Sequence, residues 1–173
     1  MINFIVTAEE PKGPWSKADF KFQAENIATQ KLQNAGHNCI ATQVLIMPEE
    51  WIGTEKLLHE VEKTITNAES RPAYYPGAED RQNAARQHPK AKVLDSGVGR
   101  TIIYDVDTHL DEPCFTDEYF SPVLTTVSIS GKDPAAFLLE AVKFANEKLD
   151  GTLGVNIIIH PKTIKAHKAA LDS

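Results

Sequence analysis

Cys39 is the residue whose type and setting could most directly do chemistry. It lies in the stretch NAGHNCIATQVLIMP (34–48), where a small polar loop brings the cysteine to the start of a strand-forming run. A thiolate is a strong nucleophile, and a loop beside a helix end can expose it and tune its pKa. Cys39 could instead be a buried structural thiol, because free cysteine is among the most buried residue types. The residues alone leave both interpretations open.

His37, Cys114 and Glu118 are weaker candidates. His37 lies two residues before Cys39, but residues i and i+2 of an extended loop point the same way without necessarily touching. Cys114 lies in DEPCFTDE, and the neighbouring carboxylates disfavour a thiolate, so we expect an inert thiol. Glu118, within TDEYFSP just before a strand, is by itself typical of a solvated loop acid.

Other kinds of site have little support in the sequence. The six histidines (37, 59, 88, 109, 160 and 167) show no metal-ligand spacing, so we expect no metal site. The segments SGVGR (96–100) and GTLG (151–154) match neither the dinucleotide fingerprint nor a P-loop and are expected to be ordinary turns. No GxSxG motif is present. Thiol chemistry is therefore the leading hypothesis.

Length, composition and charge bound the class of protein. The chain has 173 residues, of which 42% are hydrophobic, enough for one domain with a real core. Its net charge of −6 argues against a nucleic-acid partner. No apolar run reaches membrane-spanning length, and the first residues do not resemble a signal peptide. We therefore expect a cytoplasmic protein without a membrane partner, whose two cysteines are free thiols.

The elements that must position Cys39 follow from hydrophobic periodicity and from caps. Ser16 and Asp19 resemble a capping box, and Asp133-Pro134 is a favourable helix start. We expect helices over about 17–34, over 135–149 and over 162–171. We also expect a helix that starts near residue 54 and a short helix that ends near residue 88. We expect strands over 3–6, 42–47, 91–95, 101–106, 123–130 and 153–160, the last of them buried. This alternation predicts an α/β domain with a mostly parallel sheet flanked by helices.

Several of these segments together resemble the aldehyde dehydrogenase superfamily. The segment NAGHNCIATQVLIMPEEW is similar to the catalytic-cysteine segment of that family, and GPWSKADFKFQAENIATQKLQNAG is similar to the helix before it. DEYFSPVL resembles the Glu-Ile-Phe-Gly-Pro-Val stretch, and FANEKLDGTLGVNIIIHP resembles the later Ala-Asn and Gly-Leu segment. The resemblance covers nearly the whole chain in order. RPAYYPGAEDRQ is similar to a divergent branch of aldehyde dehydrogenases.

The resemblance implies roles for individual residues. Cys39 matches the nucleophile, Glu118 matches the acid that contacts the nicotinamide-side ribose of NAD or NADP, and Phe120 matches the aromatic residue beside it. Asn146 matches a structural position. The implied reaction is oxidation of an aldehyde substrate through a thiohemiacetal and then a thioester.

The resemblance is incomplete in ways that keep other functions open. His37, Gln43 and Ser121 stand where the family commonly has Gln, Arg and Gly. No residue of the chain matches the family's general-base glutamate, and its Rossmann cofactor domain has no counterpart here. We therefore expect residues 1–173 to form a single partial catalytic domain that does not oxidise aldehydes with NAD(P) by itself.

Two alternatives follow from this incompleteness. One is an inactive assembly module that forms a homo-oligomer, or binds a partner chain, through exposed sheet edges. The other is an NAD(P)-independent thiol esterase.

Overall fold

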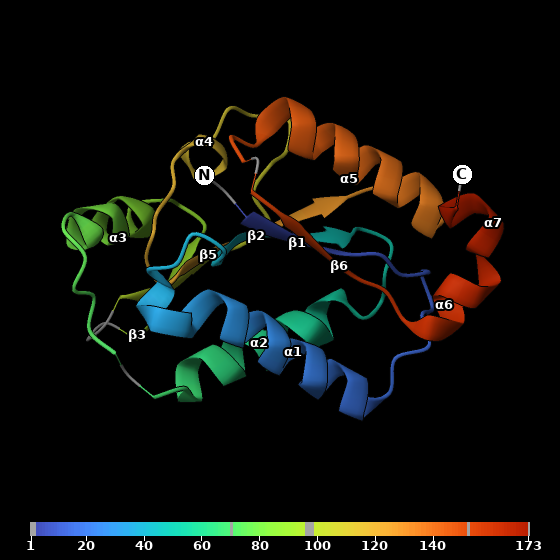
Figure 1. The fold of residues 1–173 in the computed structure, drawn as a ribbon, viewed down its shortest axis with the longest axis horizontal. Coiled ribbons are helices and arrows are strands. Elements are labelled where there is room, and N and C mark those ends of the chain that lie inside the picture. Colours follow the sequence, from blue (N-terminus) through green and yellow to red (C-terminus); the bar gives the residue numbers. More distant parts are fainter. Residues whose placement is uncertain (1–2, 70, 96–98, 152, 173) are drawn as a thin grey trace.

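A single mixed sheet lies between layers of helices in the computed structural model, which describes residues 3–69, 71–95, 99–151 and 153–172 (Figure 1). The strand order is β3-β4-β5-β2-β1-β6. All neighbouring pairs are parallel except β3 and β4. The predicted α/β domain with a mostly parallel sheet is therefore confirmed.

The elements lie close to the expected positions. The strands are β1 (Asn3–Thr7), β2 (Thr42–Pro48), β3 (Ala91–Asp95), β4 (Arg100–Ile103), β5 (Val123–Ile129) and β6 (Val155–Ile158). The helices are α1 (Lys17–Leu32), the 3-10 helix η1 (Gln33–Gly36), α2 (Thr54–Asn67), α3 (Ala78–Arg86), α4 (Pro113–Thr116), α5 (Pro134–Lys148), α6 (Pro161–Ala166) and α7 (Lys168–Leu171).

Strand β2 is the centre of the core, and it leads directly out of the cysteine loop. All its residues are buried. Because side chains alternate across a strand, Val44 and Ile46 pack with α5 on one face, whereas Leu45 and Met47 pack with α1 and α2 on the other. The loop before β2 thus leads directly into a fully buried strand inside the sheet.

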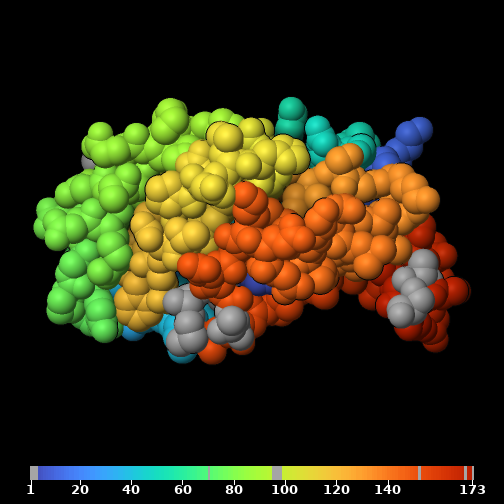
Figure 2. Space-filling model, turned by 90° about the horizontal axis from the view of Figure 1, so that it is seen from above, coloured from blue at the N-terminus to red at the C-terminus, as the bar shows by residue number. Residues whose placement is uncertain are grey.

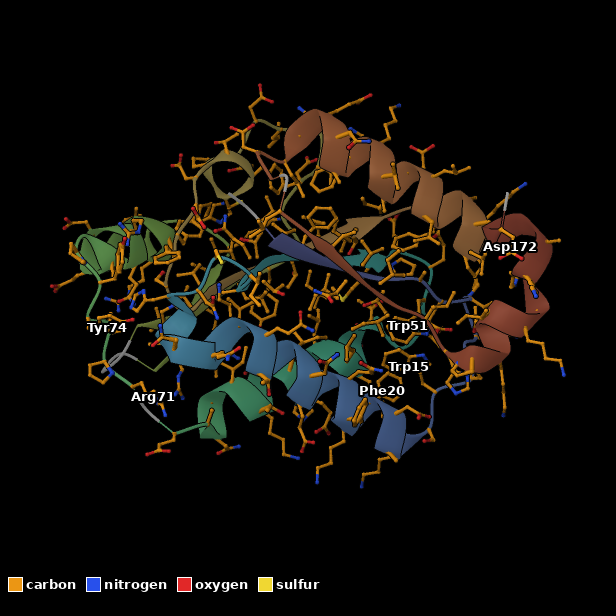
Figure 3. The ribbon with its side chains drawn as sticks, viewed as in Figure 1. Trp15, Phe20, Trp51, Arg71, Tyr74 and Asp172 are labelled. Carbon is orange, nitrogen blue, oxygen red and sulfur yellow. The ribbon has the colours of Figure 1, made fainter. Side chains whose placement is uncertain are left out.

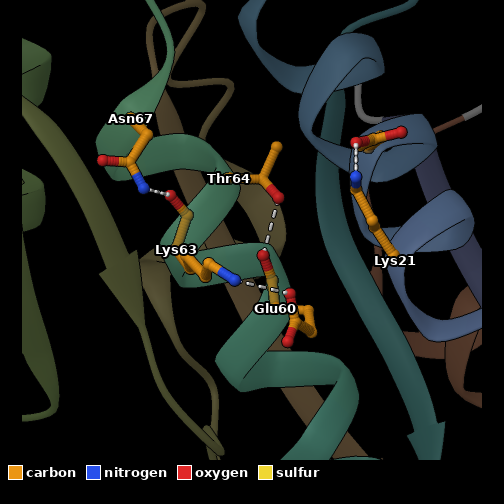
Figure 4. A network of polar contacts seen from close by, with 6 residues as sticks. Lys21, Glu60, Lys63, Thr64 and Asn67 are labelled. Atoms are coloured by element: carbon orange, nitrogen blue, oxygen red, sulfur yellow. Dashed lines mark hydrogen bonds and ion pairs between the residues drawn. The ribbon is translucent and has the colours of Figure 1, made fainter. Parts of the chain in front are cut away.

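Local interactions define the ends and the outer faces of the helices. Ser16 and Asp19 form the predicted reciprocal capping box at the start of α1, and Asp133 accepts a hydrogen bond from Ala136 N at the start of α5. Along α2, Thr64 Oγ1 donates to the Glu60 carbonyl and Asn67 Nδ2 donates to the Lys63 carbonyl (Figure 4). These contacts stabilise the helix that packs beside α1.

A buried carboxylate and three aromatic rings fasten the start of α1 to the core. Trp15, Phe20 and Trp51 lie together near the beginning of α1, at the opposite end from Tyr74 (Figure 3). Glu9, 2% exposed, accepts hydrogen bonds from Trp15 Nε1 and from the His160 backbone at 2.8 and 2.6 Å. The segments that follow β1 and β6 are therefore tied to each other and to the start of α1.

Strand β6 corrects one expectation. Residues 153–160 were predicted to be a buried strand, but β6 is an edge strand in which Val155 and Ile157 are 48% and 55% exposed. An apolar run looks alike whether it lies in the middle of a sheet or at its edge, because burial depends on which strands pair beside it.

Smaller differences have local causes. Strand β4 ends at Ile103 rather than at 106, because Asp105 adopts a φ of 44°. The expected last helix is divided at His167, whose φ and ψ of −111° and 17° are not helical. The short helix α4 was not expected. Most of the SGVGR segment (residues 96–98) and residue 152 of GTLG lie outside the described residues.

Helix α5 and the segment around α4 cover one side of the sheet (orange and yellow in Figure 2). None of the helices in the described part of the chain combines the length and the apolar composition that crossing a membrane requires.

Candidate functional site

The loop that carries Cys39 begins with an unusual turn. Asn34, Ala35 and Gly36 have φ values of 53°, 55° and 76°, three successive residues in the left-handed region. That region is costly for residues with a side chain, and glycine adopts it freely. Gly36 is also required sterically, since a Cβ atom there would lie 2.5 Å from the carbonyl carbon of Ser121. The turn therefore presses the loop against the segment before β5.

Hydrogen bonds hold this strained turn. The Asn34 side-chain amide donates to the His37 carbonyl at 3.0 Å and to the Tyr74 hydroxyl at 2.8 Å. The backbone N–H of Ala41 donates to the Asn38 carbonyl at 2.9 Å. The backbone is thus fixed on both sides of Cys39, so the position of the thiol is set by the loop.

Cys39 is exposed, so the interpretation of it as a buried structural thiol is wrong. Its Sγ lies 3.8 Å from Asn38 Oδ1, a weak contact for a thiol donor. The nucleophile candidate therefore faces solvent at the amino end of β2.

His37, unlike Cys39, points into the protein. It is 5% exposed, and its ring lies 4.9 Å from Tyr74, 5.9 Å from Tyr75 and 5.7 Å from Phe120, measured between ring centroids. Its Nδ1 lies 2.7 Å from the Phe120 carbonyl oxygen. Its Nε2 has no hydrogen-bond partner among the described residues, so His37 and Cys39 are not hydrogen-bonded to each other.

The segment of Glu118 and Phe120 is brought beside the cysteine loop by residues that the sequence did not single out as ligands. Buried Gln43 donates to the Asp117 carbonyl at 2.6 Å and accepts from Tyr119 N at 2.8 Å. Arg81 Nε donates to the Tyr119 carbonyl at 2.6 Å. Because Gln43 lies in β2, the strand that follows Cys39 also holds the segment of the predicted cofactor-binding residues.

Glu118 is half-buried, and its charge acts on a lysine inside the core. Lys31 is 2% exposed, and burial lowers its pKa to about 7, an effect that the negative charge of Glu118 partly offsets. The sequence contained a signal for this residue, since Lys31 lies four residues after Ile27 and continues the apolar stripe of α1. Lysine on such a stripe is buried when the stripe faces the sheet.

Cys114 provides a contrast to Cys39. It is buried, and burial above all raises the pKa of its thiol to about 11, with the Glu112 carboxylate as a smaller cause. The predicted inert thiol is therefore supported, although burial rather than the acidic neighbours is the main reason.

Two grooves lie at opposite ends of the sheet. One of 370 Å³ is lined by Ile40, next to Cys39, together with Gln30, Gln33, Gly154, Val155 and Asn156. A larger one of 590 Å³ lies beside α5 and is lined in part by Glu49, which follows β2, and Ser130, which follows β5. The described residues contain no group of three or more His, Cys, Asp or Glu residues placed to hold a metal ion.

Sequence comparison does not place the chain in a family, since no family model and no curated protein matches it. Solved structures do match. A 1-pyrroline-5-carboxylate dehydrogenase from Thermus with bound NAD has a TM-score of 0.71 and 16% identity over 97% of this chain. The NADP-dependent glyceraldehyde-3-phosphate dehydrogenase of Bacillus halodurans complexed with NADP has the same score and identity over 99%.

Lactaldehyde dehydrogenase of Escherichia coli is similar over 98% of this chain, with a TM-score of 0.68 and 18% identity. The matches cover only 33%, 35% and 37% of those three chains, so this chain spans about a third of their length. At these identities the likeness establishes the fold. The resemblance to aldehyde dehydrogenases inferred from the sequence is confirmed at that level.

Proposed function

We propose that Cys39 is the nucleophile of an aldehyde-oxidising site of the NAD(P)-dependent aldehyde dehydrogenase type. One observation carries the proposal: within this fold, a strained and hydrogen-bonded loop presents an exposed thiol beside the segment of Glu118 and Phe120. The other thiol, Cys114, is buried and has a raised pKa. Of the two cysteines, only Cys39 is accessible to a carbonyl substrate.

The proposed first step is addition of the Cys39 thiolate to the aldehyde carbon. The thiol proton leaves to solvent, a C–S bond forms, and the carbonyl oxygen becomes the oxyanion of a thiohemiacetal. The backbone N–H of Cys39 is the candidate donor to that oxygen. The turn at Asn34–Gly36 supplies the preorganisation that such a donor needs, because it is costly to form and cannot easily relax.

Glu118 and Phe120 are the candidate cofactor-binding residues. The half-buried Glu118 carboxylate can accept a hydrogen bond from a ribose hydroxyl. The half-buried Phe120 ring, which contacts His37 and Tyr75, is an apolar group of the kind that lines ligand sites, so both residue types suit a nicotinamide riboside. NAD or NADP, when bound, would supply the hydride acceptor.

Competition between an aldehyde and an alkylating reagent tests the role of Cys39. We expect iodoacetamide to modify Cys39 much faster than Cys114, as measured by peptide mass spectrometry. We also expect propanal to slow that modification, because the thiohemiacetal occupies the sulfur.

The matched control is an ordinary exposed thiol, made by Gln87→Cys at an exposed position in a Cys39→Ala background. Equal protection of both thiols by propanal, or slow modification of Cys39, would show that the loop confers no special reactivity and would remove the proposal.

An assembly module is the second candidate function, and strand β6 favours it. β6 is an edge strand with exposed Val155 and Ile157, and such edges are templates for pairing with another chain. Dimerisation of a protein without selective reactivity at Cys39 would support this candidate over the enzyme.

A further inference from the structure

The ring of His37 has a defined protonation pattern. Its Nδ1 lies 2.7 Å from the Phe120 carbonyl oxygen, which can only accept a hydrogen bond, so Nδ1 carries the proton. In the neutral ring Nε2 is then an unprotonated acceptor. This atom is buried and has no hydrogen-bond partner among the described residues.

The surroundings of His37 favour that neutral form. Burial is the main cause that lowers the pKa of His37, the hydrogen bond to Phe120 partly opposes it, and the positive charges of Arg81 and Lys31 lower it further. The other ionisable groups against the ring are the hydroxyls of Tyr74 and Tyr75, and Glu118 acts on Lys31. At neutral pH the Nε2 lone pair is therefore available.

A buried acceptor without a hydrogen-bond partner lowers the stability of the folded protein. A buried polar atom without a partner costs about 1–3 kcal/mol. The turn at Asn34–Gly36 that places His37 adds backbone strain. Both costs fall within the few residues that lead to Cys39.

His37 is also close enough to the thiol to act on its chemistry. Two residues of chain separate their Cα atoms by at most about 7 Å. An acyl group on Cys39 Sγ and the imidazole therefore belong to the same short stretch of loop, although the ring points inward and the thiol faces solvent. The ring is covered by Tyr74 and Tyr75. The Tyr74 hydroxyl is held by Asn34, whereas Tyr75 is 48% exposed, and exposed side chains change rotamer within nanoseconds. Movement of Tyr75 would give a water molecule access to Nε2.

We propose that His37 is the general base that hydrolyses acyl groups carried by Cys39. The inference rests on the proposed function, since it requires Cys39 to form a thioester. A water O–H bond breaks, its proton passes to Nε2, and the water oxygen bonds to the thioester carbon. The C–S bond then breaks, its electron pair stays on the sulfur, and the sulfur takes the proton from Nε2. The products are a carboxylic acid and the free thiol, with no redox change.

Acetylation by p-nitrophenyl acetate tests this step without any nicotinamide cofactor. Intact-mass spectrometry follows the acetyl group on Cys39 as it forms and disappears, in the wild type and in His37→Asn. The Asn side chain can keep the hydrogen bond to the Phe120 carbonyl but has no atom at the Nε2 position. We expect similar acetylation rates and an acetyl-enzyme lifetime at least about tenfold longer in the variant.

The control is His109→Asn, at an exposed histidine near the opposite end of the sheet, which should leave the lifetime unchanged. Equal lifetimes in wild type and His37→Asn would overturn the role of His37 and leave Cys39 as a nucleophile. Absence of any acetyl group on wild-type Cys39 would overturn both proposals together.

The wild type alone gives a second measurement that does not depend on the folding of a variant. Deacetylation should accelerate as His37 loses its proton, with an inflection below the ordinary histidine pKa of about 6.5, because burial holds this pKa down. A rate without an inflection in that range would contradict the proposal.

Discussion

At the scale of single residues, Lys31 is the most perturbed charged group in the neighbourhood of the site. Its position on the apolar stripe of α1 takes the ammonium group out of water, and the pKa falls from 10.5 to about 7. Because Lys31 also acts electrostatically on His37, its charge state affects the ring that we propose as a base. A substitution at Lys31 therefore probes both the stability and the electrostatics of the site.

We predict that replacing Lys31 by Met removes a pH-dependent loss of folding stability. Between pH 7 and 10.5 the unfolded chain holds a proton that the folded chain has lost, so the free energy of unfolding of the wild type rises with pH there. The slope from this group is at most about 1.4 kcal/mol per pH unit. Lys31→Met should be more stable than the wild type near pH 7, and the gap should narrow toward higher pH.

Urea unfolding at several pH values in this window measures the gap between the two proteins. Lys21→Met, at a lysine whose side chain is 71% exposed, is the control and should show no such trend. A stability difference for Lys31→Met that stays constant with pH would mean that Lys31 keeps its ordinary pKa in the folded protein.

At the scale of elements, the connection from α1 to β2 decides where the thiol lies. The helix ends at Leu32, the chain reverses through three left-handed residues, and β2 begins at Thr42. Gly36 lies directly against the Ser121 backbone, in the segment before β5. The geometry of Cys39 relative to Glu118 and Phe120 therefore depends on this one turn.

We predict that Gly36→Ala lowers the free energy of unfolding by about 1–3 kcal/mol, since overpacking against a rigid backbone has this cost. The added Cβ would meet the Ser121 carbonyl group, and the φ of 76° strains any residue other than glycine. Thermal and urea unfolding measure the loss, and the alkylation rate of Cys39 reports the displaced loop.

A second variant separates the two causes. Asn tolerates a left-handed φ better than Ala does but brings the same Cβ atom. If the clash with Ser121 dominates, Gly36→Asn should be about as unstable as Gly36→Ala. A nearly wild-type Gly36→Asn would assign the whole effect to the backbone angle.

At the scale of the whole molecule, the sheet has two unlike edges. β3 is antiparallel to its neighbour and exposes Val93, whereas β6 is parallel and exposes both Val155 and Ile157. An edge that is both apolar and unpaired on one side favours association with another chain.

We predict concentration-dependent association through β6. Sedimentation velocity over a range of protein concentrations should show a larger species that Ile157→Lys reduces, because a charge on the edge strand must be desolvated on pairing. Val93→Lys on the opposite edge is the control and should leave association unchanged. A wild type that stays monomeric at every concentration would contradict the prediction and weaken the assembly candidate.

The sequence by itself determined most of the helices and strands. The apolar period of α1 and α2, the caps at Ser16 and Asp133, and the apolar run of β2 are local signals, and each appears where it was expected. Local patterns succeed here because helix ends and strand composition depend on neighbours within a few residues. The alternation of helices and strands was sufficient for the fold class.

Only the tertiary structure decided which of these residues are accessible and which are charged. The exposure of Cys39, the edge position of β6 and the burial of His37 and Lys31 all depend on segments far apart in the chain. Desolvation and strand pairing depend on which distant segments pack together, and the spacing of residues along the sequence does not reveal this. The proposed nucleophile was therefore visible in the sequence, whereas the proposed base became apparent only from the packing of His37 against Phe120.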